Sequence, residues 1–145
     1  MGDRGAVEAV RLAVASLNEG DVDAYLAGFD PECRRWISGF DQPLDLGDVG
    51  DSLRQLGVAF EGLSLDEDVL FGDERFVCAR WRMRGLHVAE YLGVAPTGRS
   101  IDVETCEVYE IHNGQVVTTW VYGDVLGQLV DQMAGQSVAD EGPSS

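Results

Sequence analysis

The sequence predicts an α+β domain in which helices close one face of a strongly curved antiparallel sheet and leave a cone-shaped pocket. Apolar residues recur at helical spacing over much of residues 4–60, and strand-type alternation follows over residues 63–122. A strand running from Arg75 toward Glu90 would extend about 50 Å if straight, which exceeds the diameter of a domain of 145 residues. The strand must therefore bend, and a bent sheet covered by helices encloses a cavity.

Three helices are expected before the main sheet, over residues 4–17, 21–29 and 48–60. In the first helix, apolar residues recur on one face: Val7, Val10, Val14 and Leu17. Asp21 is placed to cap the second helix, and Pro31 follows its end. A short strand over residues 33–40, which contains Trp36, is expected between the second and third helices.

Four strands are expected next, over residues 63–71, 76–85, 101–111 and 115–122. The second strand alternates cleanly, with arginines on one face and apolar residues on the other: Val77, Ala79, Trp81 and Met83. Gly85 is the expected position of the bend or bulge. The Asn113-Gly114 pair predicts a tight hairpin between the last two strands, because both residues tolerate positive φ.

The C-terminal region is expected to hold one more helix and a tail. Asp124 is placed to cap a helix that runs through Met133. Residues 135–145 are small and polar, so we expect them to be disordered. The interior shows no linker and no repeat, so the chain is expected to form one domain over residues 1–134.

The charge balance excludes several partners. The chain carries 26 acidic and 10 basic residues, for a net charge of −16, so we expect it to bind neither nucleic acid nor anionic membranes. All ten basic residues are arginine, which excludes a Schiff-base lysine and a phosphate-binding loop lysine. No apolar run approaches the length of about 18 residues that spans a membrane. The first residues do not resemble a signal peptide, so a cytoplasmic location is expected.

The cysteines and histidines predict neither a metal site nor a disulfide framework. Cys33, Cys78 and Cys106 are odd in number and widely spaced, without a Cys-x-x-Cys motif. His87 and His112 are separated and lack an acidic spacing motif, so a metal site is not expected. We therefore expect chemistry without a cofactor.

The segment from Gly85 to Arg99 reads G-L-H-V-A-E-Y-L-G-V-A-P-T-G-R. It resembles the pattern G-x-H-x-G-x-F/L-x-G-I/V/M-P-P-T-G-K/R that is typical of SnoaL-like polyketide cyclases, which belong to the nuclear-transport-factor-2-like superfamily. The continuation is also similar to the family: an Asn-Gly hairpin, a strand that carries Trp120, and Asp124 opening the last helix. The resemblance extends over roughly residues 3–133 and is strongest from Gly85 onward.

The resemblance implies a curved sheet around an apolar pocket, usually in a homodimer. It also implies a small, apolar, polyketide-like substrate. The best-known members close a ring by an intramolecular aldol step without metal or cofactor, and related members hydroxylate, isomerise or open epoxides. These cyclases carry an H-W-D-x-x-D type stretch whose first Asp is the acid/base group. Here Thr119 and Val121 stand in place of that His and Asp, and a valine cannot transfer a proton.

Three residues remain as candidate catalytic groups. Strand alternation places Glu107 on one face with Thr105 and Tyr109, where a carboxylate among apolar walls suits general acid/base catalysis, whereas a register slip of one residue would place it in solvent. His87 lies just past the expected bend, and we expect a His87–Glu107 pair to be the proton-transfer unit. The alternative for His87 is a structural histidine bound to backbone. Asp124 is expected to be mainly a helix cap, with catalysis as its second role.

The remaining candidates are expected to line the pocket or its mouth as substrate-binding residues, although each also fits an ordinary core: Trp36, Trp81, Met83, Tyr91, Tyr109, Thr119 and Val121. Two functions follow. The first is a cofactor-independent tailoring enzyme that uses cyclase-type or isomerase-type acid–base chemistry in an apolar pocket. The second is a non-catalytic protein that binds a small molecule, which the residues at positions 119 and 121 favour.

Overall fold

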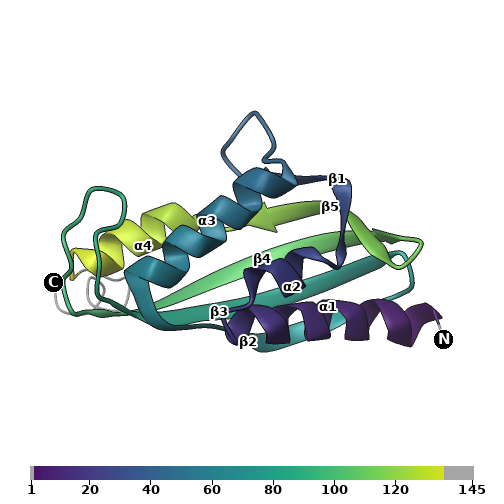
Figure 1. Ribbon diagram of the computed structural model, residues 1–145, viewed down its shortest axis with the longest axis horizontal. Helices are drawn as coiled ribbons and strands as arrows, with labels where there is room; N and C mark the ends of the chain where they lie inside the picture. The colour runs from purple at the N-terminus through teal and green to yellow at the C-terminus, as the bar shows by residue number, and fades with distance from the viewer. Residues whose placement is uncertain (1, 136–145) are drawn as a thin grey trace, which may run out of the picture.

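A mixed sheet of five strands, in the order β1-β5-β4-β3-β2, carries helices on one of its faces (Figure 1). This computed structural model describes residues 2–135, so the predicted tail from residue 136 onward lies outside the described residues. The helices are α1 (Gly2–Asn18), α2 (Val22–Leu26), α3 (Leu46–Ala59) and α4 (Val125–Met133). The strands are β1 (Phe29–Ile37), β2 (Phe60–Gly72), β3 (Phe76–His87), β4 (Ser100–His112) and β5 (Gln115–Tyr122). The predicted α+β class is confirmed, and the sheet is curved without closing into a barrel.

Strand β1 corrects the prediction that the sheet is purely antiparallel. It pairs with β5 in parallel, so that Arg35 lies opposite Thr119 and Ile37 lies opposite Val121. Since all of β2, β3 and β4 separate these strands in the sequence, no hairpin fixes their relative direction. The strand also begins at Phe29, four residues before the predicted start. The result is that residues from the N-terminal quarter of the chain enter the sheet beside its last strand.

Aspartates set the starts of the three later helices. The side chain of Asp21 accepts a hydrogen bond from the amide of Ala24, as predicted for the cap of α2. Asp45 caps α3 through a reciprocal arrangement with Asp48, so this helix begins two residues earlier than predicted. Within residues 2–135, no helix combines the length and apolar character needed to cross a bilayer.

The inner face of β3 is apolar over residues 77–83, as its alternation predicts. Val77, Ala79, Trp81 and Met83 are all buried there. Helix α1 packs over the part of the sheet that carries Val77, Ala79 and Trp81. Helix α4 covers the part around Met83 with Leu129 and Met133. The outer face of the same strand carries arginines that form ion pairs with acidic residues on β2 and β4.

The predicted bend lies at Gly85, although the extra residue belongs to the neighbouring strand. Along β2, Glu61 pairs with Leu86 and Ser64 pairs with Arg84, so two residues of β2 face Gly85. A Cβ atom at position 85 would lie 3.0 Å from the Cβ of Phe60, which is buried at the α3–β2 junction. The absent side chain therefore allows β2 and β3 to bend together.

We predict that Gly85→Ala lowers the free energy of unfolding by about 1–3 kcal/mol, because the new methyl group overpacks against Phe60. Gly57→Ala is the matched control, because no atom lies within 4 Å of the added Cβ in α3. The control should be neutral or raise stability by up to about 1 kcal/mol, since alanine favours a helix. Urea denaturation measures both, and equal effects would contradict this account of the bend.

Candidate functional site

A chain of buried polar side chains crosses the inner face of the sheet. Glu107 projects inward from β4, is 7% exposed, and lies directly opposite Val121 on β5. The hydroxyl of Tyr109 donates a hydrogen bond to Oε1 of Glu107 (3.1 Å). The indole Nε1 of Trp81 in turn donates to the oxygen of Tyr109 (3.0 Å). The carboxylate is therefore oriented by two aromatic side chains from adjacent strands.

Arg35 completes this chain from the other side. Its Nη2 lies 3.0 Å from Oε2 of Glu107, at ion-pair distance but without the alignment of a hydrogen bond. The same nitrogen donates to the hydroxyl of Tyr25 (2.9 Å), and Nε donates to Oγ1 of Thr119 (3.2 Å). A buried ion pair is tolerated when further hydrogen bonds hold both charges, and these contacts provide them. We call the six residues the polar network: Tyr25, Arg35, Trp81, Glu107, Tyr109 and Thr119.

Burial sets the protonation of the network. It raises the pKa of Tyr25 to about 12, although the nearby guanidinium of Arg35 opposes the rise. It also raises the pKa of Tyr109 well above its ordinary value. For Arg35, burial alone would lower the pKa, but the Glu107 carboxylate and the Tyr25 hydroxyl raise it overall. At neutral pH both tyrosines therefore keep their hydroxyl protons, and Arg35 is a fixed cation.

Part of the network remains accessible although it faces inward. The side chains of Arg35 and Glu107 retain 12% and 9% of their accessible surface. Val121, Ile37 and Thr105 share this face and are half-buried, whereas Tyr109 and Thr119 next to them are sealed. We call these five accessible residues the polar corner: Arg35, Ile37, Thr105, Glu107 and Val121. It presents a carboxylate and a guanidinium beside apolar side chains, an arrangement that can move a proton and stabilise a negative charge.

The predicted pairing of His87 with Glu107 is wrong. Glu107 lies opposite Ala79 on β3, whereas the amide of His87 donates to the carbonyl of Arg99, the residue just before β4. Ala79 and His87 are eight positions apart on β3, which is about 26 Å along an extended strand. The side chains of His87 and Glu107 both lie on the inner face, but far apart along the length of the sheet.

His87 instead holds the loop that follows it. The amide of Thr97 donates to Nδ1 of His87 (3.2 Å), and Oγ1 of Thr97 lies 2.9 Å from the same nitrogen. Because Nδ1 accepts from an amide, the ring proton is on Nε2, which is buried and has no partner among the described residues. The carbonyl of His87 also accepts from the amide of Gly98. This geometry is that of a structural histidine bound to backbone, the alternative given above for His87.

The predicted pocket wall divides between the two faces of the sheet. Trp81, Met83 and Tyr109 are buried on the inner face, and Thr119 and Val121 also project inward. Trp36 does not belong to this wall, because it lies in register with Trp120 on the outer face and is 40% exposed. Its neighbour on the strand, Arg35, takes the inward position that the prediction gave to Trp36.

Two other predicted residues lie away from the polar corner. Tyr91, in the loop after β3, packs its ring edge-on against Phe60 with centroids 5.4 Å apart. Asp124 is exposed, and its carboxylate accepts from the amide of Gly127 (3.0 Å), so it is the cap of α4. A role for either side chain in substrate binding or catalysis stays a prediction.

Arg35 and Tyr25 belong to the polar network but were not predicted from the sequence. The signal for Arg35 was present, because Cys33, Arg35 and Ile37 alternate along one face of β1. Tyr25 offered no such signal, since it lies in a helix of five residues with no pattern of its own. Its hydroxyl can accept the hydrogen bond from Arg35 only because the fold brings α2 next to β1.

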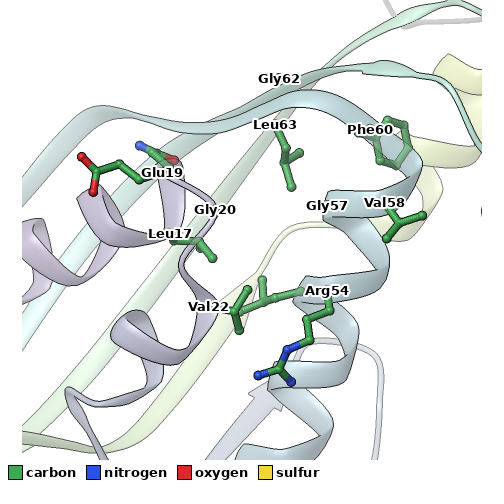
Figure 2. A pocket seen from close by; sticks show the side chains of 12 residues that line it. Leu17, Glu19, Gly20, Val22, Arg54, Gly57, Val58, Phe60, Gly62 and Leu63 are labelled. Atoms are coloured by element: carbon green, nitrogen blue, oxygen red, sulfur yellow. The ribbon is translucent and has the colours of Figure 1, made fainter.

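A separate cleft of about 520 Å³ lies between the α1–α2 turn, α3 and the start of β2 (Figure 2). Its wall is largely apolar, with Leu17, Val22 and Leu63 around the opening and Arg54 at the rim. Phe60 also lines it, and the same ring lies 5.2 Å from the imidazole of His87. The residues that line this cleft differ from the pocket wall predicted from the sequence.

The curved open sheet, with helices on one face, is the architecture of the nuclear-transport-factor-2-like domains. The family model described as SnoaL-like polyketide cyclase matches residues 7–132, so the chain belongs to this family. The resemblance found in the sequence is therefore confirmed. Family membership supports a role in polyketide tailoring.

Solved structures agree with this assignment of the fold. AclR of Streptomyces galilaeus, a proposed hydroxylase, superposes with a TM-score of 0.80 at 22% identity, over 90% of this chain and 97% of AclR. A proposed polyketide cyclase of Xanthomonas campestris gives 0.81 at 16% identity, over 92% and 99% of the two chains. TsrD of Streptomyces laurentii gives 0.75 at 26% identity, over 90% and 96%. Among curated proteins, none matches this chain in sequence.

We predict that stability falls at alkaline pH because of Tyr25. Its pKa is raised in the folded state, so the folded protein holds a proton that the unfolded chain releases above its ordinary value near 10. The stabilisation is complete below pH 10 and is lost as the pH rises toward 12, by about 1 kcal/mol per pH unit. Urea denaturation of the protein and of Tyr25→Phe across this range measures the effect, which the variant should reduce. An unchanged slope in the variant would contradict the prediction.

Proposed function

We propose that this chain is a cofactor-independent polyketide tailoring enzyme in which Glu107 transfers a proton at a carbon next to a carbonyl group. The observation that carries the proposal is the register of β4 and β5, in which Glu107 lies directly opposite Val121. Position 121 is where the cyclases of the family are expected to carry their acid/base aspartate. The carboxylate is thus supplied from the neighbouring strand, to the same part of the inner face.

The proposed reaction begins when ionised Glu107 takes a proton from the carbon. The electron pair of that C–H bond forms a carbon–carbon double bond, and the carbonyl becomes an enolate. Attack of the enolate carbon on a second carbonyl of the substrate closes a ring, and the oxygen of that carbonyl takes the proton back from Glu107. Return of the proton from Glu107 to another carbon instead isomerises the substrate. The apolar side chains of Ile37 and Val121 restrict water around the carboxylate, which favours both outcomes over loss of the proton to solvent.

A second candidate function is binding without catalysis. The inner face carries Thr119 and Val121 where proton carriers are expected in the family, and Thr119 is fully buried in a hydrogen bond with Arg35. The cleft of Figure 2 offers an apolar wall of the size range of small-molecule sites. A binder would be stabilised by its ligand and would leave the ligand unchanged.

We predict that Glu107→Gln slows proton transfer by about 10²-fold or more, because the amide cannot accept the proton. The assay incubates the protein in deuterated water with a panel of aromatic β-keto esters and follows deuterium entry by proton NMR. Glu104→Gln is the matched control, because Glu104 lies on the outer face of the same strand.

Full exchange activity in Glu107→Gln would refute the role of the carboxylate. If the unaltered protein catalyses no exchange but its melting temperature rises with a β-keto ester, binding without catalysis is the function.

We infer a cytoplasmic location from the sequence. We also infer a homodimer, with the outer face of the sheet as its interface. Trp36 and Tyr122 are 40% and 49% exposed there, on either side of the half-buried Trp120. Exposed aromatic side chains grouped on one sheet face are typical of protein interfaces.

We predict that Trp36→Glu converts a dimer into a monomer, because a charge at the centre of an apolar interface stays unpaired. Light scattering coupled to size exclusion measures the mass of the protein and of the variant. Phe40→Glu, at an exposed position in the loop after β1, is the control and should leave the mass unchanged. A monomeric unaltered protein, or a dimeric Trp36→Glu, would contradict this interface.

A further inference from the structure

The guanidinium of Arg35 has an unused end. Its Nε is bonded to Thr119, and its Nη2 serves both Tyr25 and Glu107. Its Nη1 makes no hydrogen bond with any residue that the structure describes. The Arg35 side chain keeps 12% of its accessible surface, so it is not wholly sealed from solvent. Nη1 therefore carries two N–H donors of this guanidinium that no described residue uses.

The shape of the guanidinium places those donors beside the base. Its nitrogen atoms share one plane, and Nη1 and Nη2 are bonded to the same carbon. A group bound on the edge that Nη1 and Nη2 share would lie on the same guanidinium as Glu107, whose carboxylate is at ion-pair distance from Nη2. The bonds from Nε to Thr119 and from Nη2 to Tyr25 fix the plane before any ligand arrives.

From this geometry we infer that Nη1 of Arg35 binds the oxygen that becomes negative in the substrate, so that the polar corner accepts carbonyl compounds as their enolates and aromatic alcohols as their phenolates. The inference deepens the proposed function and rests on it for the identity of the base. It assigns Arg35 a contact with the reacting group in addition to its contact with Glu107.

The charges in the corner explain why such a site favours enolate formation. Before the reaction, Arg35 is paired with ionised Glu107. When Glu107 takes the proton it becomes neutral, and the negative charge moves to the substrate oxygen at Nη1. The cation faces one anion at each stage, so no unpaired charge is created in a buried place. The neighbouring tyrosines stay neutral, because burial holds the pKa of both above the neutral range.

The test uses 2-naphthol, whose ionised and neutral forms differ in absorbance. We expect the protein to bind it mainly as naphtholate at neutral pH. Arg35→Gln should lower the affinity for naphtholate by about tenfold or more, because a charge-assisted hydrogen bond is lost. Arg35→Lys keeps the charge but loses the planar fork, so it should also bind naphtholate more weakly. Near-ultraviolet circular dichroism verifies folding, and Arg35→Lys remains a test if Arg35→Gln does not fold.

Two further variants separate this inference from the proposed function. Glu107→Gln should bind naphtholate at least as tightly as the unaltered protein, since the competing anion is gone, although it no longer transfers protons. Arg75→Gln removes an exposed arginine just before β3, away from both the polar corner and the cleft of Figure 2, and should leave binding unchanged. If Glu107→Gln keeps its exchange activity, the proposed base is wrong while the anion site at Arg35 stands.

Three outcomes would overturn the inference. The first is naphtholate binding that is equally tight in the unaltered protein, Arg35→Gln and Arg35→Lys. The second is binding of neutral naphthol with no gain in the ionised form. The third is the absence of binding up to the solubility of the probe.

Discussion

The structure depends on the buried ion pair between Arg35 and Glu107. It joins the edge strand β1 to β4 across β5, at a place where either charge alone would destabilise the fold. Tyr25, Tyr109 and Thr119 supply the hydrogen bonds that make both charges tolerable. Helix α2 is tied to the sheet by the same contacts, so the short helix and the irregular first strand acquire fixed positions that their own sequences do not impose.

Under the proposed function, the same pair would supply the carboxylate that Val121 does not. Val121 removes the carboxylate from β5, and Glu107 returns one from β4 at the paired position. A buried carboxylate needs a compensating charge, and the guanidinium of Arg35 lies at ion-pair distance to supply it.

The sequence was sufficient to predict the structure wherever the signal comes from residues close together in the chain. Periodicity located the longer helices and the strands of the main sheet, the caps at Asp21 and Asp124 followed from residue type, and alternation placed Glu107 on the inner face. It failed where the outcome depends on contacts between distant segments. The parallel pairing of β1 turned Trp36 outward and Arg35 inward, and no local pattern specifies that pairing. The sequence also does not give the separation of His87 and Glu107, because that separation depends on the register of β3 against β4.

The position of β1 at the sheet edge has a consequence for how the protein assembles during synthesis. Its neighbour in the sheet is β5, and 84 residues separate Arg35 from the threonine that it contacts there. Until the C-terminal hairpin has left the ribosome, the arginine has neither its strand partner nor its carboxylate, and the early helices lack the sheet that they cover. The polar corner thus forms among the last contacts of the fold, and a nascent chain that stops before β4 carries an unpaired cation and an open strand edge.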